Sequence, residues 1–434
     1  MYRLLFHVDE RKLYKLYPIV LDVASYSMRV GELVETLKMR ALPKSSDEYN
    51  TLIVFLRLYR DATQFVVNKL WSLDKVPSMS VLHRMFYSEL RKLGFRAHHV
   101  KQIYVYAKAI VKASKGNGGK KPILRKLTAR VDKYDYKLDL DNRILILKTL
   151  DSKEVKLKLL TSNERVEKYR GWSSYEVAVK VVEDRVYIAI YFKKVVKLKK
   201  PKTVMTVDVN FDNITLAIFT PGGELLKLKR YKTPLRRILT HRIWIEKIQR
   251  RYSRSWRFIE GIRKAIKRHG ERIKNIAWDC AHKIGDRIAE LANRYSSLIV
   301  LENLNHLRDR VNGNNSFNKK LSLWFYRRMQ FTINYEAIER GLKTRYVNPM
   351  NTSSTCPRCG SRLKDNSGRI MRCSRCGFTG DRDVIACINL FHRYLRCGGL
   401  GVPLNAPKGD AIPRPMQGNK YEAMKTTYIN LYKS

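Results

Sequence analysis

Apolar residues recur every three or four positions through much of the first third of the chain, which is the period of an amphipathic helix. The pattern begins near Asp47, is carried at first by Leu52, Phe55 and Leu58, and continues to about Ser114. Residues 115–122 read KGNGGKKP and would end a helix, because glycine and proline are the poorest helix formers. Residues 1–46 mix short apolar runs with Lys and Arg, and they predict strands joined by loops.

The period changes from residue 123 to residue 198, where apolar and charged residues alternate. Examples are the segments RILILKTL, KEVKLKLL and YEVAVKVV. Strict alternation is the pattern of a strand with one buried face. It predicts an antiparallel sheet or small barrel whose outer face is rich in lysine.

A β-meander follows, with strands expected at 203–209, 214–220 and 225–230 and turns rich in Asn and Gly between them. The next segment is helical and has isoleucine or tyrosine at every seventh position from Ile245 to Ile273. This spacing predicts a helix–helix seam. We expect the chain to fold back near Gly270 and to keep its basic residues on the outside.

The remaining elements alternate between helix and strand. The expected segments are a helix at 277–293, a strand at 298–301, a helix at 321–341, a strand at 343–347 and a helix at 384–394. A loop rich in Gly and Asn at 312–316 could be a lid or a plain surface loop. A meander followed by this alternation is typical of a ribonuclease-H-like α/β domain.

Composition adds a strong charge signal. The 434 residues include 87 Lys and Arg against 39 Asp and Glu, for a formal net charge of +48. Such an excess makes a compact chain repel itself, so we expect a polyanion in the working assembly. The alternative is a basic surface that serves only solubility, although acidic residues serve solubility better.

Several locations and protein classes are disfavoured by the sequence. No apolar run of about 18 residues predicts a membrane span, and the N-terminus lacks the pattern of a signal peptide. We therefore expect a cytoplasmic, prokaryotic protein that works at the nucleoid and has no membrane partner. The chain also lacks a P-loop and the His-hydrophobe-His pair of HUH strand-transfer enzymes.

Four of the seven cysteines form two CxxC pairs, each followed by glycine. These residues are Cys356, Cys359, Cys373 and Cys376. Two thiolates separated by two residues can reach one tetrahedral ion, so the set predicts a closed, structural Zn²⁺ site rather than a redox pair. We expect the other three, Cys280, Cys387 and Cys397, to be packing residues.

Three acids stand at the ends of predicted strands or at the start of a helix. Asp208 lies in VMTVDVN, Glu302 follows LIVL, and Asp383 precedes VIAC. Ionised carboxylates at such buried positions are costly unless a cation lies beside them. The three predict a site for two Mg²⁺ or Mn²⁺ ions that would cleave phosphodiester bonds, with Asp208 the expected bridging ligand.

Asp381 competes with Asp383 for the third position. We favour Asp383 because small residues follow it, and we expect Asp381 to cap the helix or to form a turn. The glutamate is the middle acid of the three. A DDE transposase would place it last, on the final helix.

The segments VDVNFDNITLAIF, LIVLENLNHL, RYVNPMNTSSTCPRCG and CSRCGFTGDRDVIACINL resemble the TnpB (OrfB) family of insertion-sequence proteins, which are related to type V CRISPR effectors. They lie within 201–395, in the order and spacing of the family. The family usually has Asn-Ala-Ala where this chain has Ile385-Ala-Cys387, but Asn389 is retained.

The resemblance implies a multidomain α+β and α/β fold: a β-barrel wedge domain with a helical recognition insert, then an RNase H/RuvC-like nuclease domain with an inserted zinc ribbon. The implied domains are a first wedge part at 1–46, the recognition insert at 47–122, a second wedge part at 123–200, the nuclease at 201–350 with a basic hairpin at 233–292, the ribbon at 351–380, the last nuclease segment at 381–398 and a tail at 399–434. Candidate nucleic-acid contacts are Arg236, Arg237, Arg250, Arg251 and Arg254 of the hairpin, with Lys120 and Lys121 of the glycine-rich tract.

The resemblance also implies an activity. A guide RNA derived from the transposon end would select double-stranded target DNA beside a short adjacent motif, and one RuvC-like site would cut both strands. Asp208, Glu302 and Asp383 would be its catalytic residues. The alternatives are a non-cleaving nucleic-acid-binding repressor or transposition accessory, and a structure-selective nuclease without a guide.

Overall fold

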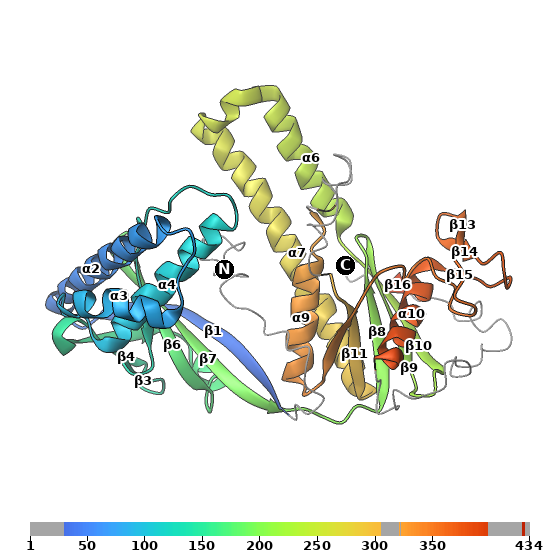
Figure 1. Ribbon diagram of the computed structural model, residues 1–434, viewed down its shortest axis with the longest axis horizontal. Coiled ribbons are helices and arrows are strands. Elements are labelled where there is room, and N and C mark those ends of the chain that lie inside the picture. The colour runs from blue at the N-terminus through green and yellow to red at the C-terminus, as the bar shows by residue number, and fades with distance from the viewer. Residues whose placement is uncertain (1–29, 305–320, 322, 398–427, 430–434) are drawn as a thin grey trace. The chain divides into compact units, whose positions relative to one another are not determined.

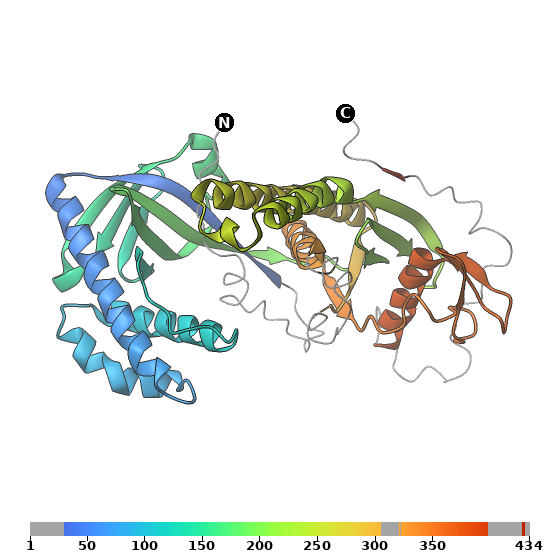
Figure 2. The same ribbon diagram turned by 90° about the horizontal axis from the view of Figure 1, so that it is seen from above.

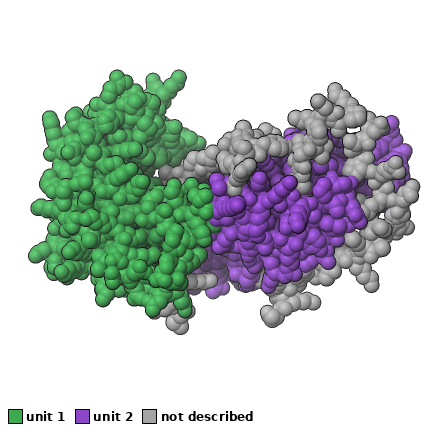
Figure 3. Space-filling model, turned by 90° about the horizontal axis from the view of Figure 1, so that it is seen from below, with its two compact units in different colours: residues 1–27, 32–195 green, residues 28–31, 196–434 purple. Residues whose placement is uncertain are grey.

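The computed structural model describes residues 30–304, 321, 323–397 and 428–429, coloured along the chain in Figure 1. The loop expected at 312–316 lies outside the described residues, as do most of 1–46 and of the tail at 399–434. The chain forms two compact units (Figure 3): of the described residues, the first holds 32–195, and the second holds 30–31 and those from 196 onward. We call them unit 1 and unit 2 and describe each by itself.

Three helices of unit 1 confirm the helical pattern of the first third of the chain. They are α2 (Ser46–Trp71), α3 (Met79–Arg91) and α4 (Ala97–Lys115). The hydroxyl of Ser45 caps α2 by accepting a hydrogen bond from the backbone N–H of Glu48. Helix α4 ends where the glycine- and lysine-rich tract begins.

The residues with period two and one strand from the segment 1–46, β1, form a seven-stranded sheet in the order β2-β6-β7-β1-β5-β4-β3. Its strands are β1 (Val30–Pro43), β2 (Leu127–Asp132), β3 (Tyr136–Asp139), β4 (Ile144–Lys148), β5 (Glu154–Leu160), β6 (Ser173–Val182) and β7 (Arg185–Lys197). In β5 the side chains of Val155, Leu157 and Leu159 are buried and the lysines between them are exposed. The sheet and its lysine-rich face were therefore predicted correctly, whereas closure into a barrel stays a prediction.

The sheet of unit 2 has the order β12-β11-β8-β9-β10-β16. Its strands are β8 (Thr203–Val209), β9 (Asn213–Phe219), β10 (Leu225–Lys232), β11 (Ser297–Glu302), β12 (Thr344–Val347) and β16 (Tyr428–Ile429). The meander β8–β9–β10 is antiparallel, as expected, and β11 pairs in parallel with both β8 and β12. This mixed sheet is the platform of the candidate site.

Helices cover the two faces of this sheet. Met205 and Val207 of β8 share a core with residues of α7 (Glu260–Arg294) and α9 (Tyr326–Glu339). Val204 faces the other way and packs with residues of α10 (Arg382–Arg396). Because side chains alternate along a strand, the even-numbered residues of β8 point toward α10.

The helical hairpin of unit 2 differs from the expectation. Helix α6 (Leu235–Tyr252) ends in a 3₁₀ turn, η2 (Ser253–Arg257), and the chain reverses there rather than near Gly270. Gly270 lies inside α7, which is one continuous helix of 35 residues. The regular spacing of isoleucines concealed the turn, since Tyr252 and Ile259 flank it instead of continuing the seam.

Helix α9 is also shorter than the helix expected at 321–341. It ends at Glu339, just before Gly341, whose φ of +73° is the left-handed conformation that commonly terminates a helix. None of the helices described in either unit is long and apolar enough to cross a bilayer.

Candidate active site

Three carboxylates come together on the face of the unit 2 sheet that α10 covers. Asp208 is near the end of β8, Glu302 ends β11, and Asp383 lies in the first turn of α10. The parallel register pairs Val207 with Leu301, so the next residues along, Asp208 and Glu302, stand on neighbouring strands. Each acid is at most 7% exposed. Residues far apart in the sequence thus meet in one buried site because two parallel strands and a helix converge there.

Each of the two strand acids accepts a hydrogen bond from a neutral donor. The Asn210 amide donates to Asp208 Oδ2 over 2.6 Å. The Thr352 hydroxyl donates to Glu302 Oε1 over 3.2 Å, and the Asn389 amide donates to the carbonyl oxygen of Thr352 over 2.7 Å. Asn389 of α10 therefore fixes the position of Thr352, and the Thr352 hydroxyl in turn orients the Glu302 carboxylate.

Asp383 differs from the other two because it has cationic partners. Arg369 forms an ion pair with its Oδ2, and Arg230 lies 3.4 Å from the same atom. Arg230 is buried, and its Nε donates to the Thr215 hydroxyl over 3.0 Å. The third acid is thus held by a fixed arginine from β10 and by a second arginine from the cysteine-containing module.

Asp381 is the helix cap that we expected. Its Oδ1 accepts hydrogen bonds from the backbone N–H groups of Asp383 and Val384, at 2.9 and 3.3 Å. The same oxygen lies 2.6 Å from Arg230. This oxygen of Asp381 is therefore used by the helix terminus, and Asp381 positions the first turn of α10, which carries Asp383.

Burial and mutual repulsion raise the pKa of these acids. The pKa of Asp208 lies well above its ordinary range because of burial first, and then because of the charges of Glu302 and Asp383. Burial raises the pKa of Glu302 to about 7, against a smaller opposing effect of the Thr352 hydrogen bond. Burial also raises the pKa of Asp383, and Arg369 opposes it. The site therefore disfavours three negative charges unless cations join it.

The donor set suits hard divalent cations. Mg²⁺ and Mn²⁺ prefer carboxylate oxygens, and here the two strand carboxylates are buried beside neutral hydrogen-bond donors. Among the described residues, the four cysteines are the one set of three or more His, Cys, Asp or Glu ligand atoms found within 4.8 Å of one another. Two ions in such enzymes lie ~3.5–4 Å apart, which needs a wider set of ligands.

Sequence reasoning missed two arginines of this site. Arg230 was only one of many cations in a basic run, yet it stands two positions after Leu228, which packs on the α10 side of the sheet. That alternation could have indicated an inward-facing cation. Arg369 has no comparable local signal, because its contact with Asp383 depends on how the cysteine module folds back.

The four predicted cysteines form one cluster. Their sulfur atoms all lie within 4.8 Å of one another, with 3.6 Å between Cys356 and Cys376 and 3.5 Å between Cys359 and Cys373. A tetrahedral ion with Zn–S bonds of ~2.3 Å requires sulfurs ~3.8 Å apart. Hydrogen bonds involving Ser361 lower the pKa of Cys359 to about 6, whereas burial raises the pKa of Cys356 to about 12 and also raises that of Cys376. The cluster fits one zinc ion.

Local turns and a small sheet build this cluster. Gly360 and Gly377, which follow the two CxxC pairs, have φ of +75° and +71°, as the tight turns require. The strands β13 (Lys364–Ser367), β14 (Ile370–Arg372) and β15 (Thr379–Asp381) form an antiparallel ribbon beside it. Ile385, which stands where the family usually has asparagine, is buried against this ribbon.

The remaining cysteines fit the packing prediction only in part. Cys280 and Cys387 are buried in the cores of unit 2, as expected. Cys397 is exposed, so its assignment as a packing residue was wrong. It is the C-cap residue of α10.

The basic residues proposed as nucleic-acid contacts are all exposed, but they belong to different units. Arg236, Arg237, Arg250 and Arg251 lie near the two ends of α6, and Arg254 lies in the turn that follows it. Lys120 and Lys121 lie in unit 1. The five arginines therefore belong to one hairpin of unit 2, and the two lysines belong to unit 1.

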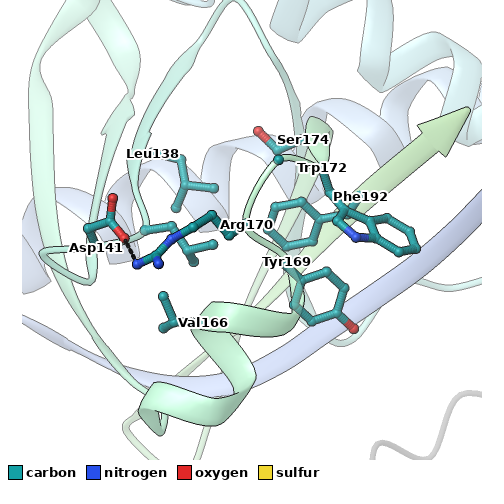
Figure 4. Close-up of a pocket in the computed structure, with 10 residues that line it drawn as sticks. Leu138, Asp141, Val166, Tyr169, Arg170, Trp172, Ser174 and Phe192 are labelled. Carbon is teal, nitrogen blue, oxygen red and sulfur yellow. Dashed lines mark hydrogen bonds and ion pairs between the residues drawn. The ribbon is translucent and has the colours of Figure 1, made fainter.

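Unit 1 also has a pocket of about 220 Å³, drawn in Figure 4. Two aromatic residues that line the pocket pack against each other: the rings of Tyr169 and Phe192 are stacked, with centroids 4.6 Å apart. Arg170 reaches Asp141 in an ion pair of 3.1 Å. This pocket is smaller than the ~300–1,000 Å³ of typical ligand sites and includes none of the candidate site residues.

Comparisons with known proteins point to one group. Residues 326–390 match the Cas12f1-like TNB domain, a span that includes the four cysteines and Asp383. A TnpB-like protein of Methanocaldococcus jannaschii is 33% identical over 263 residues, which cover 59% of this chain and 92% of the relative. A TnpB-like protein of Aquifex aeolicus is 28% identical over 231 residues, 48% of this chain and 74% of the relative.

Two solved structures share the fold. The Cas12f1 chain of a complex with single-guide RNA and target DNA aligns with a TM-score of 0.56 at 13% identity, over 83% of this chain and 98% of that chain. The mini-RNA-guided endonuclease CRISPR-Cas_phi3 aligns with a TM-score of 0.51 at 11% identity, over 87% and 94%. At this identity the likeness concerns the fold alone.

Proposed function

Because this chain belongs to the TnpB family, we propose that it is an RNA-guided DNA endonuclease of the type V kind whose active site is Asp208, Glu302 and Asp383. The observation that carries the proposal is the convergence of these buried acids from β8, β11 and α10. A buried group of like charges with raised pKa values is expected where metal-assisted chemistry occurs. The fold assignments that go with it are a RuvC-like nuclease in unit 2 and a wedge domain with a recognition insert in unit 1.

The acids would hold two Mg²⁺ or Mn²⁺ ions, which supply a hydroxide nucleophile and stabilise the leaving oxygen of the phosphodiester. Asp208, whose carboxylate is repelled by both other acids, is the natural bridging ligand. Asn210 and Thr352 orient one oxygen each of Asp208 and Glu302, which leaves the other oxygens of these carboxylates for metal. Arg230 keeps Asp383 in place through its contact with Thr215.

The charge of the chain fits the substrates. A formal charge of +48 is far more than the roughly six to ten phosphate contacts of many DNA-binding proteins need, and a guide RNA with its DNA heteroduplex offers many more phosphates. We propose that the guide RNA comes from the transposon end and selects double-stranded DNA beside a short adjacent motif. The four-cysteine cluster would bind a structural Zn²⁺ and take no part in the chemistry, since four thiolates leave no open position.

The test replaces Asp208 by alanine in the complex of protein and guide RNA. We expect plasmid cleavage to fall on the order of 10⁴-fold, because the bridging ligand is lost, while target binding stays within about twofold. Asp279→Ala, an exposed acid of α7 that pairs with Lys283, is the matched control and should cut normally. Cleavage by Asp208→Ala at the wild-type rate would refute the site.

The same assay separates the alternatives. Wild-type protein that binds the target in Mg²⁺ without forming product would be a repressor or a transposition accessory. Protein stripped of RNA that still cuts would be a structure-selective nuclease. Cleavage that requires both the guide and its matching sequence supports the proposal.

A further inference from the structure

The helical hairpin of unit 2 continues well beyond the core that anchors it. In α7 the buried residues begin at Ala277, and none of residues 260–276 is buried. Seventeen helical residues at ~1.5 Å each extend about 25 Å. Over this length α7 runs beside α6, as both views of the ribbon show (Figures 1 and 2). We call residues 244–276 the arm.

The end of the arm presents aromatic side chains. Phe258 is 86% exposed, more than any other large apolar side chain in the described part of the chain. Trp256 is half-buried, and the Arg257 guanidinium lies 4.8 Å from the centre of its ring. We call Trp256, Arg257 and Phe258 the tip. Single exposed apolar residues are common on protein surfaces. An exposed Phe258 ring close to a Trp256 ring that forms a cation–π contact with Arg257 is a rarer arrangement and indicates a binding surface.

The backbone holds the tip in one conformation. The N–H groups of Phe258 and Ile259 both donate to the carbonyl oxygen of Ser255, over 2.9 and 3.3 Å. Ser253, at the end of α6, has φ of 41° and ψ of −126°, a conformation that is costly for any residue except glycine. Strain of this kind persists where the local geometry serves a purpose, and here it sets the direction in which the tip leaves α6.

The charge around the tip selects the kind of partner. Arg250, Arg251, Arg254 and Arg257 are exposed within eight residues. The nearest acid in the sequence, Glu260, is already paired with Lys264 at 2.8 Å. An apolar protein partner would have to desolvate these cations, whereas a polynucleotide offers phosphates for the arginines and a flat base for the ring.

We propose that the tip binds single-stranded nucleic acid, with an unpaired base stacked on Phe258 and the neighbouring phosphates held by Arg254 and Arg257. The proposal rests on the proposed function only for its class of partner. Two strands share this chemistry, an unpaired segment of the guide RNA and the displaced DNA strand.

The experiment uses full-length protein freed of RNA, and 12-nucleotide probes of one sequence as single-stranded DNA, single-stranded RNA and duplex DNA. Each single strand carries one 5-iodouracil, which cross-links to a stacked aromatic ring under ultraviolet light. We expect the cross-link on the tryptic peptide 258–263, which contains Phe258. The strand that cross-links identifies the source, RNA or DNA.

Affinity provides the second readout. Phe258→Ala should lower the affinity for that single strand by roughly 5- to 150-fold, the range for loss of one stacked base. It should leave the affinity for duplex DNA within about twofold of the wild type. Phe258→Trp keeps a ring and should restore binding. Ile243→Ala, which removes another apolar side chain of the hairpin that is 51% exposed, is the control and should bind normally.

Three results would overturn the proposal. The first is a cross-link confined to other peptides. The second is an equal effect of Phe258→Ala on the binding of single strands and of duplex. The third is a change in the sedimentation of the nucleic-acid-free protein on Phe258→Ala, which would identify the tip as a contact between copies of the chain. Binding of a bare probe is measured without cleavage. The tip can therefore fail this test while the nuclease assignment stands, and an inactive protein can still pass it.

Discussion

At the scale of single residues, the buried acids make stability depend on pH in an unusual direction. Burial raises the pKa of Glu302 from its ordinary value of 4.5 to about 7. Between these values the folded protein binds more protons at Glu302 than the unfolded chain does, so stability falls as the pH rises. A paired surface carboxylate has the opposite effect, because its pKa is lowered on folding.

We therefore expect Glu302→Gln to be more stable than the wild type at pH 8 in EDTA, by on the order of 2 kcal/mol, and equal to it near pH 4.5. The wild type should regain stability at pH 8 when Mg²⁺ is added, because the ions bind the ionised carboxylates, and the variant should not. Thermal unfolding at both pH values, with and without Mg²⁺, measures the four differences.

Glu290→Gln is the matched control for this prediction. Hydrogen bonds from Arg294 and Arg287 lower the pKa of Glu290, so its removal should give no gain at pH 8. A Glu302→Gln protein that is less stable than the wild type in EDTA at pH 8 would contradict the raised pKa.

At the scale of elements, the cysteine ribbon is expected to depend on its metal. Its apolar cluster contains only Leu363, Met371 and Ile385 besides two of the cysteines, with a few half-buried neighbours. A core of this size cannot order three short strands, so binding of the ion must supply the folding free energy. The ribbon also places Arg369 in an ion pair with Asp383, so we expect unfolding of the ribbon to disturb the candidate active site.

Cys376→Ser should therefore lower bound zinc from one ion per chain toward zero and open 362–375 to trypsin, while the sheet of unit 2 keeps its far-ultraviolet circular dichroism. Cleavage of DNA should fall with the metal content. Elemental analysis and limited proteolysis provide the measurements. Cys397→Ser alters a cysteine outside the cluster and should keep its zinc; full zinc occupancy in Cys376→Ser would argue against the four-thiolate site.

Two glycines of α7 give a matched pair for helix packing. A Cβ on Gly285 would lie 2.9 Å from Oγ1 and 3.2 Å from the carbonyl carbon of Thr332, so α7 and α9 would have to separate. A Cβ on Gly270 would meet nothing within 4 Å. Alanine gains about 1 kcal/mol over glycine inside a helix, and overpacking costs about 1–3 kcal/mol.

Gly270→Ala should thus stabilise the protein by up to about 1 kcal/mol, and Gly285→Ala should destabilise it by up to about 2 kcal/mol, the difference between the two effects. Urea denaturation followed by fluorescence measures both. Thr332→Ala in the Gly285→Ala background should recover part of the loss, because it removes the hydroxyl that lies nearest to the new methyl group. Equal effects of the two alanines would mean that α7 and α9 are packed less closely than described.

The same elements show which features the sequence could predict. Strands β8, β9 and β10 and the cluster of four cysteines were found because alternation and CxxC spacing are local patterns. The reversal at Ser253–Arg257 was missed because isoleucines continue on both sides of it. The contacts of Arg230 and Arg369 with Asp383 depend on tertiary register, which no local period records.

At the scale of the whole molecule, the net charge of +48 should dominate the response to salt. In protein freed of RNA the cations repel one another, and raising NaCl shortens the screening length from ~10 Å at 0.1 M to ~3 Å at 1 M. The repulsion falls, so the unfolding temperature should rise. With guide RNA bound, the same cations contact phosphates. Salt weakens this binding, because the release of counterions from the RNA becomes less favourable as the salt concentration rises.

We therefore expect opposite slopes: the unfolding temperature of the RNA-free protein rises between about 0.1 and 1 M NaCl, and that of the RNA complex starts higher and falls until the two curves meet. Differential scanning calorimetry on both samples measures the slopes. General salting-out cannot produce this result, since it would raise both curves. Parallel curves would mean that the charge is already neutralised within the protein, and the excess of lysine and arginine would then need an explanation other than bound nucleic acid.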